Sequence, residues 1–307
     1  MAPITLPEAG SQQFPRSISE SIFDDVARDS VVLKLARRVN LPENGTMIPI
    51  TTEKPVAGWV AEGARKPVTN AGSNFVFMDR KKLACIIVFS MEYVRSDPTK
   101  LYANIRPQIK EAFSTAFDLA AIHGLAADGS AGPFPSFLTQ TTKSVELGTT
   151  TQANGGTYGD IVAGLSLLVN DNKRLTGFAV DPKAEPTLLS SVDLNGRPIW
   201  VDAPADETVG NRLIGRPAGI SEGVAGPSGV PANLRILGGD WSKVAYGIGS
   251  DITFSVSNEA TVSIDGAMTS LWQDNLVALR AEAEYGLVVA DPESFVEYVD
   301  TPATPAV

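Results

Sequence analysis

Apolar residues recur at helical spacing in two stretches of the N-terminal half of the chain. A first helix is predicted from Ser17 toward Arg38, because Ser17 and Glu20 have capping-box spacing and apolar residues follow at four-residue steps. A second helix, roughly 40 Å long, is predicted over residues 99–125, where apolar residues recur at steps of three and four. Pro107 falls inside this pattern, so we expect it either to kink the helix or to mark its start.

Between these two helices the pattern predicts strands. Residues 46–50 form a short apolar run, residues 56–60 lead outward, and a polar tip over residues 63–74 turns the chain. Residues 75–77 and 83–89 then lead back, which predicts a long hairpin. Two strands alone are only marginally stable in water, and an exposed strand edge favours pairing with another chain. The arm is therefore predicted to have a partner.

Beyond residue 150 the chain alternates between short predicted helices and strands, which is typical of an α+β fold. One short helix is predicted to be capped by Asp160 and to end at Leu168, and another covers residues 188–192. The other predicted elements are strands at 178–180, 198–201, 234–237, 244–248, 252–256, 276–289 and 295–299, a turn at 195–196, and a glycine-rich loop at 215–229. The last two strands are predicted to return to the long helix.

Composition and charge narrow the range of functions. The chain has 307 residues, of which 43% are hydrophobic and 20% charged, enough for one large core or two modest ones. No apolar run approaches the roughly 20 residues of a membrane span, and the first residues lack a signal-peptide pattern. We therefore expect no membrane partner, and a protein that stays in the cytoplasm of the cell that makes it. A formal net charge of -10 argues against DNA binding that relies on many Lys and Arg contacts to phosphate.

The residues that usually carry catalysis or bind metals are few. His123 is the only histidine and Cys85 the only cysteine, so a metal site built from these two residue types is excluded by count. Cys85 has apolar neighbours and is predicted to be a buried, unreactive side chain. Glu282 and Glu284 imitate the acidic pair of a hydrolase, but a solvated face is the simpler interpretation. We predict no catalytic residue, no cofactor and no metal, and a protein that is not an enzyme.

A series of short stretches in a fixed order extends over nearly the whole chain. They are Gly58-Trp59-Val60-Ala61-Glu62-Gly63 followed by residues 77–89, the long helix ending in His123-Gly124, Phe178-Ala179-Val180-Asp181-Pro182, Asn195-Gly196-Arg197-Pro198, Leu213-Ile214-Gly215-Arg216-Pro217, Gly239-Asp240-Trp241 with Tyr246-Gly247-Ile248-Gly249, and Leu279-Arg280-Ala281 to Phe295-Val296. Through the order and spacing of these stretches, the sequence resembles the major capsid proteins of tailed bacteriophages, which have the Hong Kong 97-like fold.

The resemblance implies an α+β capsid fold with four parts. These are an N-terminal arm with the first helix at residues 1–44, an extended loop at 45–92, a peripheral domain with the long helix as its spine at 93–140 and 270–307, and an axial domain at 141–269. In this family the extended loop lies over an adjacent subunit, and axial loops meet at the centre of pentamers and hexamers. The predicted subunit-interface residues are Trp59, Glu62, Arg65, Lys66, Arg80, Lys81 and Lys82.

The resemblance also implies a function and partners. It implies a structural protein that assembles in the host bacterial cytoplasm into the icosahedral shell of the virion, around the double-stranded DNA genome of a tailed phage. The implied partners are further copies of the chain, a separate scaffolding protein, a portal protein and, as a further candidate, a decoration protein. The DNA is expected to be enclosed without sequence-specific binding. Lys54 and Lys66 lie on the loop, but no asparagine or assisting acid can be matched to them, so subunits are expected to cohere without isopeptide crosslinks.

Three alternatives stay open at this point. The same fold builds encapsulin-like bacterial compartments, which would contain a cargo protein in place of scaffold or portal. A hydrolase that uses acidic residues would lose its activity when Asp181 or Asp240 is replaced. A tail or adhesion protein would form tubes or trimers.

Overall fold

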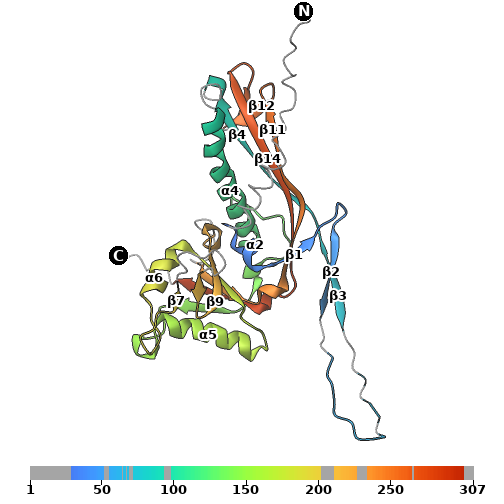
Figure 1. Ribbon diagram of the computed structural model, residues 1–307, viewed down its shortest axis with the longest axis vertical. Coiled ribbons are helices and arrows are strands. Elements are labelled where there is room, and N and C mark those ends of the chain that lie inside the picture. Colours follow the sequence, from blue (N-terminus) through green and yellow to red (C-terminus); the bar gives the residue numbers. More distant parts are fainter. Residues whose placement is uncertain are drawn as a thin grey trace, which may run out of the picture.

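The computed structural model describes residues 29–51, 55–63, 65–66, 68, 72–92, 98–201, 211–226, 234–264 and 266–300. Figure 1 shows an elongated molecule, in which a long helix and a narrow sheet form one end and a second sheet with shorter helices forms the other. A two-stranded arm leaves the junction between these two ends. Residues 17–28 of the first predicted helix lie outside the described residues.

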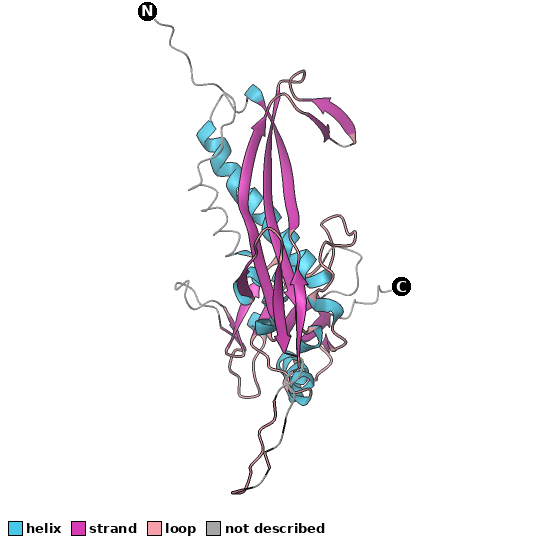
Figure 2. Ribbon diagram, turned by 90° about the vertical axis from the view of Figure 1, so that its right-hand side faces the viewer, coloured by secondary structure: helices cyan, strands magenta, loops and turns pink. Residues whose placement is uncertain are grey.

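A four-stranded sheet runs along the long helix. Its order is β1 (Arg37–Asn40), β11 (Val244–Ser257), β14 (Leu276–Val289) and β4 (Lys81–Ser90), with β1 parallel to β11 and the other pairs antiparallel. Helix α4 (Pro98–His123) lies along the sheet (Figures 1 and 2), which confirms the predicted long helix. Because α4 begins at Pro98, Pro107 does not mark its start. A small hairpin of β12 (Thr261–Ile264) and β13 (Ala267–Ser270) lies at the far end of the sheet.

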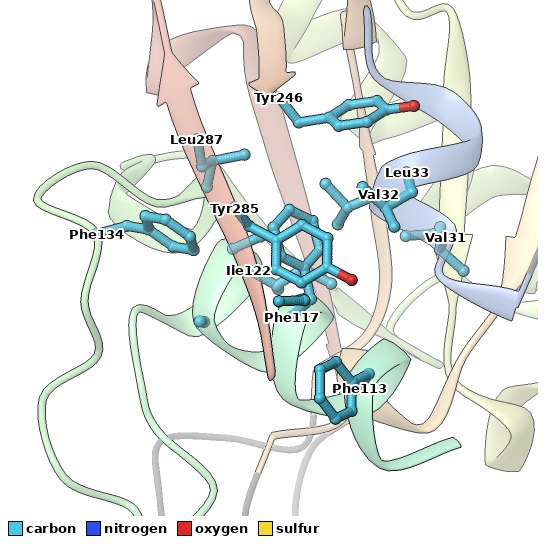
Figure 3. Close-up of a cluster of buried hydrophobic side chains, with 14 of the residues drawn as sticks. Val31, Val32, Leu33, Phe113, Phe117, Ile122, Phe134, Tyr246, Tyr285 and Leu287 are labelled. Atoms are coloured by element: carbon cyan, nitrogen blue, oxygen red, sulfur yellow. The ribbon is translucent and has the colours of Figure 1, made fainter. Parts of the chain in front are cut away.

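Aromatic side chains fill the space between α4, β14 and the short helix α2 (Val31–Leu35), as Figure 3 shows. Phe113 and Phe117 stand four residues apart on α4 and are 1% and 2% exposed, as expected for the apolar stripe of a helix. The ring centroids of Phe117 and Tyr285 lie 5.1 Å apart, and Phe134 packs edge-on against Phe117 at 6.0 Å. Full burial of one such side chain is worth about 2 kcal/mol, so this cluster holds the helix on the sheet.

The second sheet has seven strands and its own core. Its order is β5 (Ser144–Leu147), β15 (Phe295–Asp300), β10 (Leu234–Gly239), β6 (Gly177–Val180), β9 (Arg216–Ile220), β8 (Arg212–Leu213) and β7 (Trp200–Val201). Helices α5 (Thr157–Asn170) and α6 (Glu185–Ser190) belong to this end of the molecule (Figure 1). Tyr298 on β15 is fully buried, and its hydroxyl donates to the Ile161 carbonyl of α5 at 3.0 Å. The predicted mixture of helices and strands is confirmed.

The hairpin differs from its prediction. Strand β2 (Thr46–Thr51) pairs with β3 (Ser73–Met78), whereas the predicted outgoing strand at residues 56–60 has no regular structure. Strand β4, predicted to lead back along the hairpin, pairs with β14 in the four-stranded sheet instead. The apolar alternation of residues 81–90 correctly predicts a half-buried strand, but alternation does not specify the partner strand.

Several predicted boundaries in the rest of the chain are also wrong. Residues 37–40 form strand β1 and do not continue the first helix, because Ala36 is extended and ends α2. Helix α5 begins at Thr157, so Asp160 lies in its first turn and does not cap it. The second short helix, α6, covers Glu185–Ser190 in place of residues 188–192, and the predicted glycine-rich loop contains strand β9.

The two sheets do not coincide with the predicted division into segments. Strand β11 falls within the predicted segment 141–269 but pairs with β14, and residues 244–248 and 252–256 form this one strand with register shifts between them. Strand β15 falls within the predicted segment 270–307 but pairs with β10 and β5, so it does not return to the four-stranded sheet beside the long helix. None of the helices within the described residues is long and apolar enough to cross a membrane.

Candidate assembly interface

The β2–β3 hairpin has one covered and one open apolar face. On the covered face, Ile48 is 5% exposed and packs with Leu41, Ala245 and Val288 at the end of the four-stranded sheet. Successive side chains of a strand point to opposite faces, so the neighbours of Ile48 point away from this cluster. A single subunit therefore buries only half of the hairpin.

The open face carries large apolar side chains that lie opposite one another. Met47 is the cross-strand partner of Phe77, and Pro49 is the partner of Phe75. Met47, Phe75 and Phe77 are 68%, 61% and 52% exposed. A contiguous apolar surface of this kind usually marks a contact with another molecule.

The loop beyond the hairpin adds a second exposed apolar group. Trp59 makes almost no contact within the subunit, with a relative exposure of 107%, and Val56 and Val68 are 70% and 92% exposed. Residues 55–60 and Lys66 line an open hollow between the two sides of the loop. Together with the open face of the hairpin, these residues form what we call the arm surface: Met47, Val56, Trp59, Val68, Phe75 and Phe77.

The predicted interface residues of the loop are all available to a neighbour. Trp59, Glu62, Arg65 and Lys66 are exposed. Arg65 and Lys66 flank the turn of the loop with positive charge, and Glu62 adds a negative one. The structure contains a single chain, so their role at an interface stays a prediction.

Arg80, in contrast, has its partners inside the subunit. Its guanidinium lies 2.8 Å from a carboxylate oxygen of Glu284 and donates to the backbone carbonyls of Leu41, Pro42 and Gly249 at 2.9–3.0 Å. A partly buried arginine with these bonds fixes the foot of the hairpin to the sheet. A contact of Arg80 with a neighbouring subunit stays a prediction.

The two lysines that follow Arg80 are freer. Lys81 pairs with Asp79 at 2.7 Å, and this hydrogen bond lowers the pKa of the exposed Asp79 carboxyl. Lys82 lies 4.0 Å from Glu282 and is 59% exposed. Surface pairs of this kind contribute about 0–1 kcal/mol, so both lysines can exchange their partners for those of a neighbour.

A buried carboxylate that the sequence reasoning missed lies at the junction of the two sheets. Asp118 on α4 accepts hydrogen bonds from the hydroxyls of Ser30 and Ser221 at 2.6 and 2.7 Å, and from the backbone amides of Val31 and Val32 at 3.0 and 3.2 Å. Burial raises the pKa of Asp118, and the four donors act against that rise. The contact joins the incoming chain, the long helix and the connection between β9 and β10.

The acidic candidates for hydrolysis have structural partners. Asp181 accepts from Arg235 at 2.6 Å and from the amide of Lys183, and Asp240 accepts from the amide and hydroxyl of Ser242. Glu284 is bound to Arg80. Each of these carboxylates caps a turn or pairs with a cation.

His123 and Cys85 sit in packed surroundings. The Nε2–H of His123 donates to the Val224 carbonyl at 2.8 Å, and burial lowers the pKa of the imidazole. Burial also raises the pKa of the half-buried Cys85 thiol, which disfavours the reactive thiolate.

Comparison with protein families identifies the family of the chain. Residues 10–300 match the model of the phage capsid family. The chain belongs to the phage capsid family. It is 34% identical over 288 residues to the "Probable major capsid protein gp17" of Mycobacterium phage D29, covering 91% of this chain and 87% of that protein. It is 25% identical over 288 residues to the "Major capsid protein" of Staphylococcus phage 80alpha, covering 91% and 82%.

Solved structures show the same fold. A chain of Gordonia phage Cozz superposes with a TM-score of 0.68 at 22% identity, covering 90% of this chain and 87% of that chain. A chain described as "Capsid of empty GTA particle computed with C5 symmetry" gives a TM-score of 0.60 at 18% identity, covering 89% and 90%. The mixed helix-and-strand architecture is therefore that of phage capsid subunits.

Proposed function

We propose that this member of the phage capsid family is the major shell subunit of a tailed phage and assembles through pentamers and hexamers into an icosahedral shell around double-stranded DNA. The observation that carries the proposal is the arm surface, which places Trp59, Phe75 and Phe77 in water in a single subunit. Such an arm is stable only when a neighbouring subunit covers it.

The Hong Kong 97-like arrangement is part of this proposal. The four-stranded sheet and α4 form the peripheral domain, with α4 as its spine, and β11 joins this domain. The seven-stranded sheet with α5 and α6 forms the axial domain, and β15 joins it. The hairpin and the loop beyond it form the extended loop, which lies over the adjacent subunit.

The shell encloses DNA without binding it tightly. A formal net charge of -10 repels phosphate, so packaged DNA can enter and leave the shell. The subunit has a structural and not an enzymatic role, assembles in the host cytoplasm, and ends in the virion capsid. A separate scaffolding protein, a portal and a decoration protein are the proposed partners, and the subunits cohere without covalent crosslinks through large obligate interfaces.

A double substitution on the open hairpin face tests the proposal. Phe75→Ser with Phe77→Ser removes apolar surface that the isolated subunit exposes, so the subunit should fold normally. We expect the variant to stay as free subunits or capsomers in size-exclusion chromatography and negative-stain electron microscopy. Burial of each phenylalanine against the neighbouring subunit should stabilise the assembly by roughly 2 kcal/mol, and the variant loses both contributions.

Val169→Ser is the matched control. Val169 is 55% exposed on α5, far along the chain from the arm. This control should form closed particles like the unchanged protein. Normal particles from the double variant would show that the arm surface is not an assembly contact.

A further inference from the structure

Two cations that have no partner among the described residues line a hollow at the foot of the hairpin. The hollow, of about 170 Å³, lies between strand β2 and the β11–β14 end of the four-stranded sheet. Arg37 on β1 and Lys243, which precedes β11, both line it together with Ser242. Neither Arg37 nor Lys243 lies within ion-pair distance of a carboxylate in the part of the chain that the structure describes. What distinguishes these two cations from other unpaired ones is that they line the same hollow.

The chemistry of the hollow selects its ligand. None of the described residues that line it is acidic, and the remaining walls are apolar, from Ile48 and Ile50 of β2 and Val288 of β14. Its volume fits one short side chain. DNA would require a row of cations along a backbone, and the net charge of -10 repels it at longer range. A single carboxylate between an arginine and a lysine, with apolar packing around its stem, satisfies both the charge and the shape.

From this geometry we infer that the hollow binds an aspartate or glutamate side chain of a second copy of the chain. The inference rests on the proposed shell function and deepens it by naming a contact. Arg37 supplies a planar, bidentate donor and Lys243 a point charge. Since the hollow lies where the arm leaves the subunit, an occupied hollow also fixes the direction of the arm relative to the neighbour. The many acidic side chains of each copy supply candidates for the occupant.

Zero-length crosslinking in assembled particles tests the contact. Particles assembled from an equal mixture of 14N- and 15N-labelled subunits are treated with a carbodiimide, which joins the Lys243 amine to a carboxylate that touches it with loss of water. The expected product is a crosslinked peptide pair between Lys243 and an Asp or Glu, with mixed isotope labels in about half of the pairs because labelled and unlabelled copies mix at random. A Lys243 crosslink found only within single-isotope pairs overturns the inference.

Assembly of charge variants provides the second readout. Arg37→Gln should raise the subunit concentration needed for half-assembly by up to about fivefold at low salt, and the effect should shrink at high salt. Arg174→Gln is the control. Arg174 is also exposed and has no ion pair among the described residues, but it lies between α5 and β6 of the seven-stranded sheet. An equal effect of both variants would overturn the inference, since it would show a response to net charge alone.

The two proposals fail in different ways. Closed shells without an intermolecular Lys243 crosslink would overturn the carboxylate contact and leave the shell function intact. Loss of the Lys243 crosslink in DNA-filled but not in empty particles would assign the hollow to phosphate in filled particles and overturn the protein contact there. Absence of shells under all conditions would overturn the proposed function itself.

Discussion

Removal of the Asp118 carboxylate should loosen the junction between the incoming chain and the long helix. Asp118 is fully buried and accepts four hydrogen bonds, two of them from the amides of Val31 and Val32, which have no acceptor within helix α2 because they lie in its first turn. The hydroxyls of Ser30 and Ser221 can turn toward other acceptors, but the amides of Val31 and Val32 cannot.

The size of the effect follows from those donors. A buried donor without an acceptor costs about 1–3 kcal/mol, so Asp118→Ala should lower the free energy of unfolding by about 3–5 kcal/mol. Asp118→Asn keeps one acceptor oxygen and should cost roughly half as much. A Cβ added at Gly223 would lie only 2.7 Å from the Cβ of Asp118, so the space around Asp118 does not admit a larger side chain.

Denaturant unfolding and hydrogen exchange measure the effect. The amides of Val31 and Val32 should exchange at least about a hundredfold faster in Asp118→Ala, because each 1.4 kcal/mol of local stability corresponds to roughly a factor of ten. Asp128→Ala is the matched control, since Asp128 is exposed and bonds only to nearby Ser130. A loss below about 1 kcal/mol for Asp118→Ala, or an equal loss in the control, would show that the Asp118 carboxylate does not hold this junction together.

Two further predictions concern the sheets. Burial raises the pKa of Glu297 on β15 to about 7 from 4.5, so the folded protein should lose stability as pH rises between these values. Glu297→Gln should therefore raise the thermal midpoint at about pH 8.5 but not at about pH 4.5. A midpoint shift that does not depend on pH would contradict this. Arg80→Gln removes the bonds to Glu284 and three carbonyls and should lower the free energy of unfolding by about 2 kcal/mol. Arg280→Gln should change the denaturation midpoint little, because the Arg280 side chain is 52% exposed. Similar losses in both variants would argue against a special role of Arg80.

The elements predicted well from sequence are those whose pattern is local. The stripe that contains Phe113 and Phe117 repeats over about five turns of α4, from Ile105 to Ile122, and no other period fits it. Strand pairing is not local, and the partner of β4 could not be predicted because residues 81–90 would alternate in the same way beside β3 or β14. The glycine-rich stretch that contains β9 shows the reverse case, where tertiary pairing with β6 overrides a loop-like composition.

The charged residues show the same limit. Asp118 lies 88 residues from Ser30 and 103 from Ser221, so no spacing in the sequence signals their contact. Arg80-Lys81-Lys82 has the composition of an exposed basic cluster, yet Glu284 and three distant carbonyls hold Arg80 within the subunit. The exposed loop residue Trp59 could be singled out, because a tryptophan in a polar, glycine-rich stretch has no local core to enter.

Negative-stain electron microscopy of the purified chain, combined with size-exclusion chromatography at low and high protein concentration, shows directly whether the chain builds a closed shell. We expect pentamers and hexamers that convert to closed icosahedral shells as the concentration rises or when scaffolding protein is added. A persistent monomer or dimer under all of these conditions would contradict it.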